Sequence, residues 1–152
     1  MRKVYSIYLG RIALVCRLTL SAAFLYAGVT KLADPVDFAI IIDGYGLLPE
    51  LFVFPVAIIL PIIECIAAVG ILFQLRISMY AMTAMLVLFI AVLMYGIRLG
   101  LDIDCGCFGP DDPEQAYHDL RIALLRDIIF LMQIVFLFWW QSKKRNTVLI
   151  NP

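Results

Sequence analysis

The residues of this sequence that are best suited to carry out chemistry are two cysteines separated by a single glycine, Cys105 and Cys107. Two thiols at this spacing can reach disulfide geometry, and the intervening glycine has no Cβ to resist the tight turn. A ring this small is expected to be strained, and strained disulfides exchange readily. Closing so short a loop removes little chain entropy, so a purely structural bond explains the pair poorly. The pattern predicts thiol–disulfide exchange.

Two other interpretations of the cysteine pair stay open, namely a metal site shared with His118 and an inert pair. His118 is the single histidine of the chain. Two thiols and one imidazole are fewer ligands than a closed zinc site needs, so we expect no metal. His118 could instead shuttle a proton, or be an ordinary surface residue. Three cations are predicted at the outer ends of their segments, near the cysteine pair, namely Lys31, Arg98 and Arg126. A nearby cation favours the thiolate form of a cysteine, whereas two neighbouring aspartates disfavour it.

Arg17 and Glu64 lie inside long apolar stretches, where an ionisable side chain is costly by roughly 2.5–3.5 kcal/mol. Each is therefore expected to face other helices and to find a partner. At about 1.5 Å per residue along two antiparallel helices, Arg17 and Glu64 lie within about 6 Å of each other in membrane depth. We therefore predict an Arg17–Glu64 ion pair. The pair is either structural or serves to bind a polar headgroup or to move protons.

Arg126 and Asp127 lie near the start of the last apolar stretch. Arg126 either extends toward the lipid headgroups or faces the cysteine pair. Since two electrons must enter or leave the cysteine pair, a quinone held between helices near Arg126 or Lys31 is a natural hypothesis. Cys16 and Cys65 lie in apolar stretches and are expected to act as small hydrophobic residues or as an internal relay.

The elements that position these residues follow from the composition. The chain has 152 residues, of which 64% are hydrophobic and 16% are charged. A single soluble domain of this size could not bury so much apolar surface, so lipid must solvate most of it. The formal net charge is zero, which argues against binding of nucleic acid. We expect a membrane protein with one domain, residues 1–152.

Four apolar stretches are each long enough to cross the membrane as a helix, over about residues 12–29, 51–73, 77–99 and 122–140. They predict an all-α bundle of four transmembrane helices. Asp34 can cap a further short helix that begins at Pro35, ends at Gly44 or Gly46, and lies on the outer interface of the membrane. A helix that starts near Pro113 is expected to run directly into the fourth span.

Charges at the ends of the four spans predict the orientation. Lysine and arginine precede the first span, follow the fourth and occupy the turn between the second and third, whereas aspartate and glutamate crowd the other two connections. The positive-inside rule then places both chain ends in the cytoplasm. The cysteine pair falls in an outer connection. The expected location is the cytoplasmic membrane of a bacterium, with several passes through the bilayer.

The chain resembles the MauE family of methylamine-utilisation membrane proteins and the broader DoxX-like membrane proteins. The resemblance rests on Arg17 and on the motifs at residues 24–32, 44–49, 60–64, 104–109 and 125–127. It implies a four-helix bundle in the cytoplasmic membrane with a redox-active periplasmic cysteine pair. It also implies a role, beside a thioredoxin-like partner, in maturing the disulfide-rich small subunit of methylamine dehydrogenase. DoxX-like relatives include subunits tied to thiosulfate oxidation with quinone as the acceptor.

Relatives often carry Arg-Asn where this chain has Arg126 and Asp127, which puts any role that needs the amide in doubt. Taken together, the residues and the resemblance predict a membrane thiol–disulfide oxidoreductase. Its periplasmic partner would be a thioredoxin-like or cysteine-rich protein. Two alternatives are a non-catalytic assembly or chaperone subunit, and a small transporter or metal-handling protein that uses Arg17, Glu64 and the cysteines as a polar path.

Overall fold

The computed structural model is helical through nearly all of the chain that it describes, namely the backbone of residues 2–99 and 113–150. Side chains are described for residues 8–99 and 120–143. The helices of these ranges are α1 (Arg2–Ala33), α2 (Pro35–Gly44), α3 (Glu50–Leu72), α4 (Arg76–Leu99) and α5 (Pro113–Ile150). The predicted all-α class is confirmed for the described residues, and α5 does run from Pro113 directly into the last apolar stretch.

Four of these helices are long and apolar enough to cross a membrane, over Tyr8–Ala33, Glu50–Leu72, Arg76–Leu99 and Leu120–Lys143. They coincide with the four predicted spans. A helix satisfies its backbone hydrogen bonds internally, as lipid requires. Large apolar side chains cover the outside of the bundle; Leu51 and Ile77, for example, are 80% and 77% exposed. Such a surface indicates contact with lipid, so the chain is a multi-pass membrane protein.

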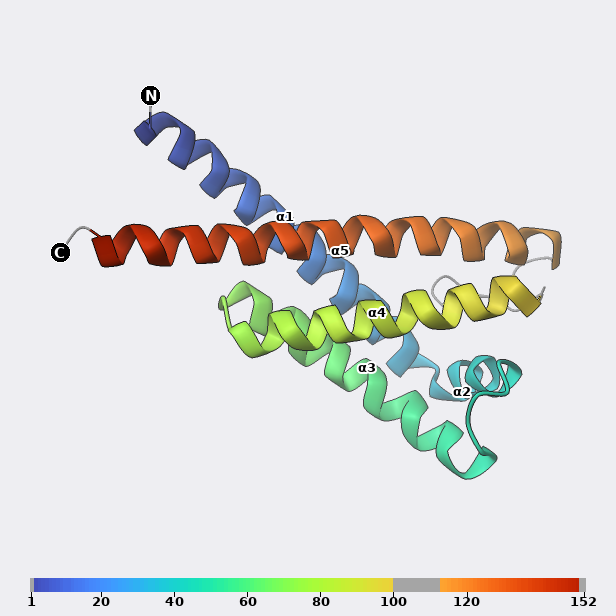
Figure 1. Cartoon of the computed structure of the whole chain (residues 1–152). Coiled ribbons are helices and arrows are strands. Elements are labelled where there is room, and N and C mark those ends of the chain that lie inside the picture. Colours follow the sequence, from blue (N-terminus) through green and yellow to red (C-terminus); the bar gives the residue numbers. More distant parts are fainter. Residues whose placement is uncertain (1, 100–112, 151–152) are drawn as a thin grey trace.

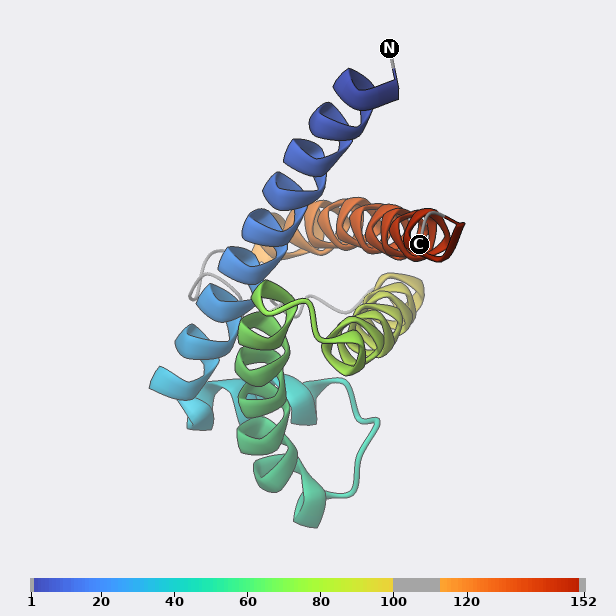
Figure 2. The same cartoon turned by 90° about the vertical axis from the view of Figure 1, so that its left-hand side faces the viewer.

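The four long helices form two crossed pairs. In both views α1 lies beside α3, while α4 runs antiparallel beside α5 (Figures 1 and 2). We call one end of the bundle the basic end: it holds the start of α1, the turn between α3 and α4, and the end of α5 (Figure 1). The opposite end, which holds α2, the start of α3 and the start of α5, we call the acidic end. The predicted grouping of these segments at two ends is therefore observed.

The short helix α2 forms as its sequence predicts. The Asp34 carboxylate accepts a hydrogen bond from the backbone N–H of Asp37 at 3.2 Å, which caps the helix, and Pro35 occupies the first position. Phe38 and Ala39 are buried and pack against the first turns of α3. The apolar side of α2 therefore covers the acidic end of α3, and its position relative to the lipid surface stays a prediction.

Helices α1 and α3 approach each other closely along faces that carry small residues. Ser21 donates a hydrogen bond from Oγ to the carbonyl oxygen of Ala68 at 2.9 Å. Further along, Gly28 is buried directly against Pro61 and its neighbours. Small residues at these positions let the two backbones pack closely in lipid, where apolar side chains gain little by meeting each other. This close contact fixes the register between α1 and α3.

The orientation of the bundle gives a first testable prediction. In a variant whose four cysteines are replaced by serine, Asp43→Cys places a single exposed thiol at the acidic end, and Ser142→Cys places one at the basic end. We expect a membrane-impermeant maleimide to label Asp43→Cys in intact cells, and Ser142→Cys only after the membrane is permeabilised. The reverse labelling would invert the predicted topology.

Candidate functional site

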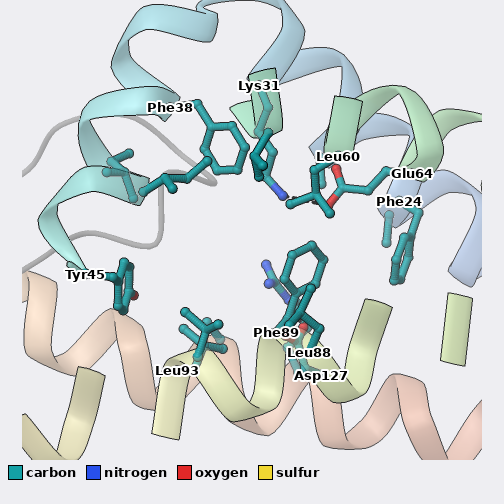
Figure 3. A pocket seen from close by; sticks show the side chains of 18 of the residues that line it. Phe24, Lys31, Phe38, Tyr45, Leu60, Glu64, Leu88, Phe89, Leu93 and Asp127 are labelled. Carbon is teal, nitrogen blue, oxygen red and sulfur yellow. Dashed lines mark hydrogen bonds and ion pairs between the residues drawn. The ribbon is translucent and has the colours of Figure 1, made fainter. Parts of the chain in front are cut away.

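A cavity of about 440 Å³ lies toward the acidic end of the bundle, and residues of all five helices line it. Most of its wall is aromatic or aliphatic, with Phe24 from α1, Phe38 from α2 and Leu88 and Phe89 from α4 (Figure 3). The cavity lies between the pair α1–α3 and the pair α4–α5, and α2 contributes Phe38, Ile41 and Ile42 to its lining. Its size is in the range of small-molecule sites.

One wall of the cavity carries a buried ion pair between Lys31 of α1 and Glu64 of α3 (Figure 3). The Lys31 Nζ lies 2.7 Å from the Glu64 Oε1, and the two side chains are only 5% and 1% exposed. The same Nζ lies 5.0 Å from the ring centroid of Phe38 and 4.7 Å from that of Phe89. The ring faces and the carboxylate together replace the water that the ammonium loses on burial.

The predicted ion pair between Arg17 and Glu64 is wrong, because Glu64 binds Lys31. The prediction assumed that α1 and α3 reach the acidic end at the same depth. Lys31 lies two residues before the end of α1, whereas Glu64 lies fourteen residues after the start of α3. Their contact therefore offsets the helix ends by roughly 18 Å, at about 1.5 Å per residue. Arg17 lines a separate cleft near the basic end, with Gln74 and Trp140.

A second ion pair lies on the opposite side of the cavity, where Figure 3 labels Asp127 beside Leu88 and Phe89, across from Lys31 and Glu64. The Arg126 Nε lies 3.1 Å from the Asp127 Oδ1, and these side chains are 32% and 4% exposed. Arg126 thus lines the cavity and binds its neighbour, instead of only extending toward the headgroups. Among the side chains that the structure describes, two acidic and two basic ones line the cavity, so the formal charges of these four balance.

The structure therefore brings together four of the residues singled out in the sequence, Lys31, Glu64, Arg126 and Asp127. Arg17 is not among them. The remaining candidates stay predictions: Cys105, Cys107 and the side chain of His118 lie outside the described residues. The two other cysteines, in α1 and α3, are free thiols and half-buried.

Sequence reasoning gave no role to the aromatic residues of the cavity. Phe38 and Phe89 flank the Lys31 ammonium, and Tyr45, which caps the end of α2, is 8% exposed in the cavity wall. Tyr45 packs against Gly96 of α4, where a Cβ would come within 2.9 Å of the tyrosine ring. A glycine in an apolar helix was the available signal for this close approach.

The arrangement suits a largely apolar molecule that carries polar oxygens. Aromatic and aliphatic walls would bury its body, while Lys31 and Arg126 are hydrogen-bond donors and Glu64 and Asp127 are acceptors that can hold protons. No group of three or more histidine, cysteine, aspartate or glutamate side chains that could hold a metal ion occurs in the part of the chain whose side chains are described.

Comparison with known proteins gives concordant matches. Residues 9–140 match the family model described as methylamine utilisation protein MauE. The chain is 34% identical over 95 residues to the methylamine utilization protein MauE of Paracoccus denitrificans, an alignment that covers 60% of this chain and 51% of that protein. The chain thus spans about half the length of this curated relative. No solved structure matches.

Proposed function

Because the chain belongs to the MauE family of methylamine utilisation proteins, we propose that it is a membrane thiol–disulfide oxidoreductase that serves protein maturation outside the cytoplasm. Cys105 and Cys107 are the proposed reactive pair. The partner would be a thioredoxin-like or cysteine-rich periplasmic protein, and by analogy with the family's role the pathway would be that of a methylamine dehydrogenase. The cell compartment would be the bacterial cytoplasmic membrane, with both chain ends inside.

The proposed reaction has two balanced steps. A thiolate of the partner attacks the Cys105–Cys107 disulfide, and a mixed disulfide between the two proteins forms. The partner's second thiol then attacks the partner's own sulfur in this mixed disulfide and releases the cysteine of this chain. The partner leaves as a disulfide, and Cys105 and Cys107 remain as two thiols. Oxidation of these thiols back to the disulfide then releases two electrons and two protons, and a membrane quinone would accept both as it becomes the quinol.

The cavity is the observation that carries this proposal. It is lined by α4 and α5, and the connection between these two helices contains Cys105 and Cys107. Apolar walls suit the ring and tail of a quinone, and the Lys31 ammonium and the Arg126 guanidinium can donate hydrogen bonds to its carbonyl oxygens. Glu64 and Asp127, each bound to one of these cations, can pass on protons as the thiols are oxidised.

Quinone reduction by the purified protein in lipid nanodiscs tests the proposal. With dithiothreitol as the thiol donor and decylubiquinone as the acceptor, we expect the wild type to reduce quinone catalytically. Cys105→Ser and Cys107→Ser are expected to fall to the uncatalysed rate, because neither can form the disulfide. The matched controls Cys16→Ser and Cys65→Ser remove the two free thiols and should keep wild-type turnover.

The same variants separate the proposal from a non-catalytic assembly subunit. In cells, the single remaining thiol of one of the two variants should attack the disulfide of the oxidised partner, which is the reverse of the proposed step. The partner is then trapped as a mixed disulfide that thiol reagents release, because the second cysteine that would release it is missing. Quinone reduction that persists without Cys105 and Cys107 would contradict the proposed chemistry. Full maturation of the partner by both serine variants would instead identify an assembly role.

A further inference from the structure

The acidic residues of this chain are confined to two segments. All twelve lie within residues 34–64 and 102–127, and residues 1–33, 65–101 and 128–152 contain none. These three acid-free segments include the start of α1, the turn between α3 and α4, and the end of α5. The basic end of the bundle therefore has no carboxylate side chain of its own with which to pair a cation.

Arg17 is nevertheless buried at this end. It is 9% exposed, and it lines a cleft of about 300 Å³ together with Trp140, Gln74 and Gln141. Among the described side chains Arg17 takes part in no ion pair and no hydrogen bond, since the two ion pairs there lie in the cavity at the acidic end. An arginine buried so far inside a membrane helix is expected to have a partner.

The cleft has the composition of an anion site. The guanidinium offers up to five N–H donors in a planar fork, which matches the oxygens of a phosphate. Gln74 carries an amide donor and Trp140 an indole N–H, and the Gln141 amide nitrogen, which donates one hydrogen to the Met79 Sδ at 3.0 Å, has a second N–H. Three exposed cations surround this end of the bundle, Arg11, Arg76 and Lys143, and add a positive field.

We propose that this cleft binds a phosphate-ester anion, with the Arg17 guanidinium as its principal ligand. Two sources share this chemistry, the headgroup phosphate of an anionic lipid and a soluble phosphate. The site lies near the end of the bundle opposite the cavity, and it is independent of the proposed redox chemistry. Its occupant would supply the negative charge that the chain lacks here.

Lipid-dependent stability of the full-length protein tests the site. In detergent, addition of phosphatidylglycerol is expected to raise the melting temperature of the wild type more than the same amount of phosphatidylcholine does. Arg17→Gln is expected to bind phosphatidylglycerol at least about tenfold more weakly, because a charge-assisted contact is lost. Arg11→Gln removes an exposed arginine of the same helix that adds to the positive field but does not line the cleft. It is the matched control and should weaken binding much less than Arg17→Gln does.

Two further arms complete the experiment. Inorganic phosphate alone should reproduce the stabilisation if the natural occupant is soluble, and should have no effect beyond that of chloride if it is a lipid. Gln141→Leu leaves Arg17 in place and should weaken binding if the cleft is the site, even if Arg17→Gln folds poorly. Equal binding by wild type, Arg17→Gln and Gln141→Leu would overturn the proposal, as would an equal loss in Arg11→Gln.

Discussion

Glu64→Gln is expected to lower the free energy of unfolding by about 3–5 kcal/mol, since it leaves the Lys31 ammonium buried without its carboxylate. The two side chains are almost completely buried, so little water can replace the lost partner. The ring faces of Phe38 and Phe89 attract the ammonium but do not neutralise its charge. Unfolding of the purified protein in mixed micelles, followed by circular dichroism, measures the change.

A double variant separates the charge pair from the packing around it. Lys31→Met with Glu64→Leu removes both charges and should recover most of the stability lost in Glu64→Gln, because no buried charge is left unpaired. The double variant should still fail to reduce quinone if the pair serves the proposed reaction. Glu50→Gln, an exposed acid at the start of the same helix, is the matched control and should change the free energy of unfolding by less than about 0.5 kcal/mol.

A double variant as unstable as Glu64→Gln would contradict this explanation, because it has no unpaired buried charge. Since glutamine has nearly the same shape as glutamate, such a result would place the lost stability in the contacts that the Glu64 carboxylate itself makes.

Gly28→Ala is expected to destabilise the protein by about 1–3 kcal/mol, as overpacking of a close helix contact does. A Cβ at this position would lie 2.6 Å from the Cys65 Sγ and 3.0 Å from the carbonyl oxygen of Pro61. The backbone of α3 cannot rotate away, so α1 and α3 must separate. Since Lys31 follows one turn later, the separation is also expected to lengthen its contact with Glu64. Unfolding in mixed micelles measures the change in stability.

A second substitution identifies the contact responsible. Combined with Gly28→Ala, Cys65→Ala removes the nearer atom and should recover part of the lost stability, while the contact with the Pro61 carbonyl persists. Ala22→Val adds volume to a lipid-exposed position of α1 and should leave stability within about 0.5 kcal/mol of wild type. A Gly28→Ala variant as stable as wild type would mean that α1 and α3 can move apart at this contact without loss of stability.

Much of the fold was predictable because lipid imposes simple rules. A helix that crosses hydrocarbon needs about twenty apolar residues, and the four long stretches therefore define the four spans directly. The short helix α2 was predictable from Asp34 and Pro35, since capping depends only on local sequence. The faces of α1 and α3 that meet were predictable from their small residues and from Glu64, which lipid excludes.

The partner of Glu64 was not predictable, because it depends on how far α1 and α3 are offset along their axes. Sequence gives the length of each helix but not this offset, which the Gly28 contact and the packing of α2 on α3 determine. Lys31 was singled out as a cation near the cysteine pair and a hypothetical quinone, without its role as the counterion of Glu64. The aromatic wall formed by Phe89 and Tyr45 depends on the crossing of the two helix pairs, which no local pattern encodes.

The ion pair between α1 and α3 also bears on the biogenesis of the protein. During synthesis Lys31 leaves the ribosome well before Glu64, so its cation is already in the bilayer when the acidic helix arrives. A lone Glu64 would make insertion of α3 less favourable by roughly 2.5–3.5 kcal/mol. By pairing with Glu64, Lys31 of α1 can offset part of the cost of placing α3 in the membrane.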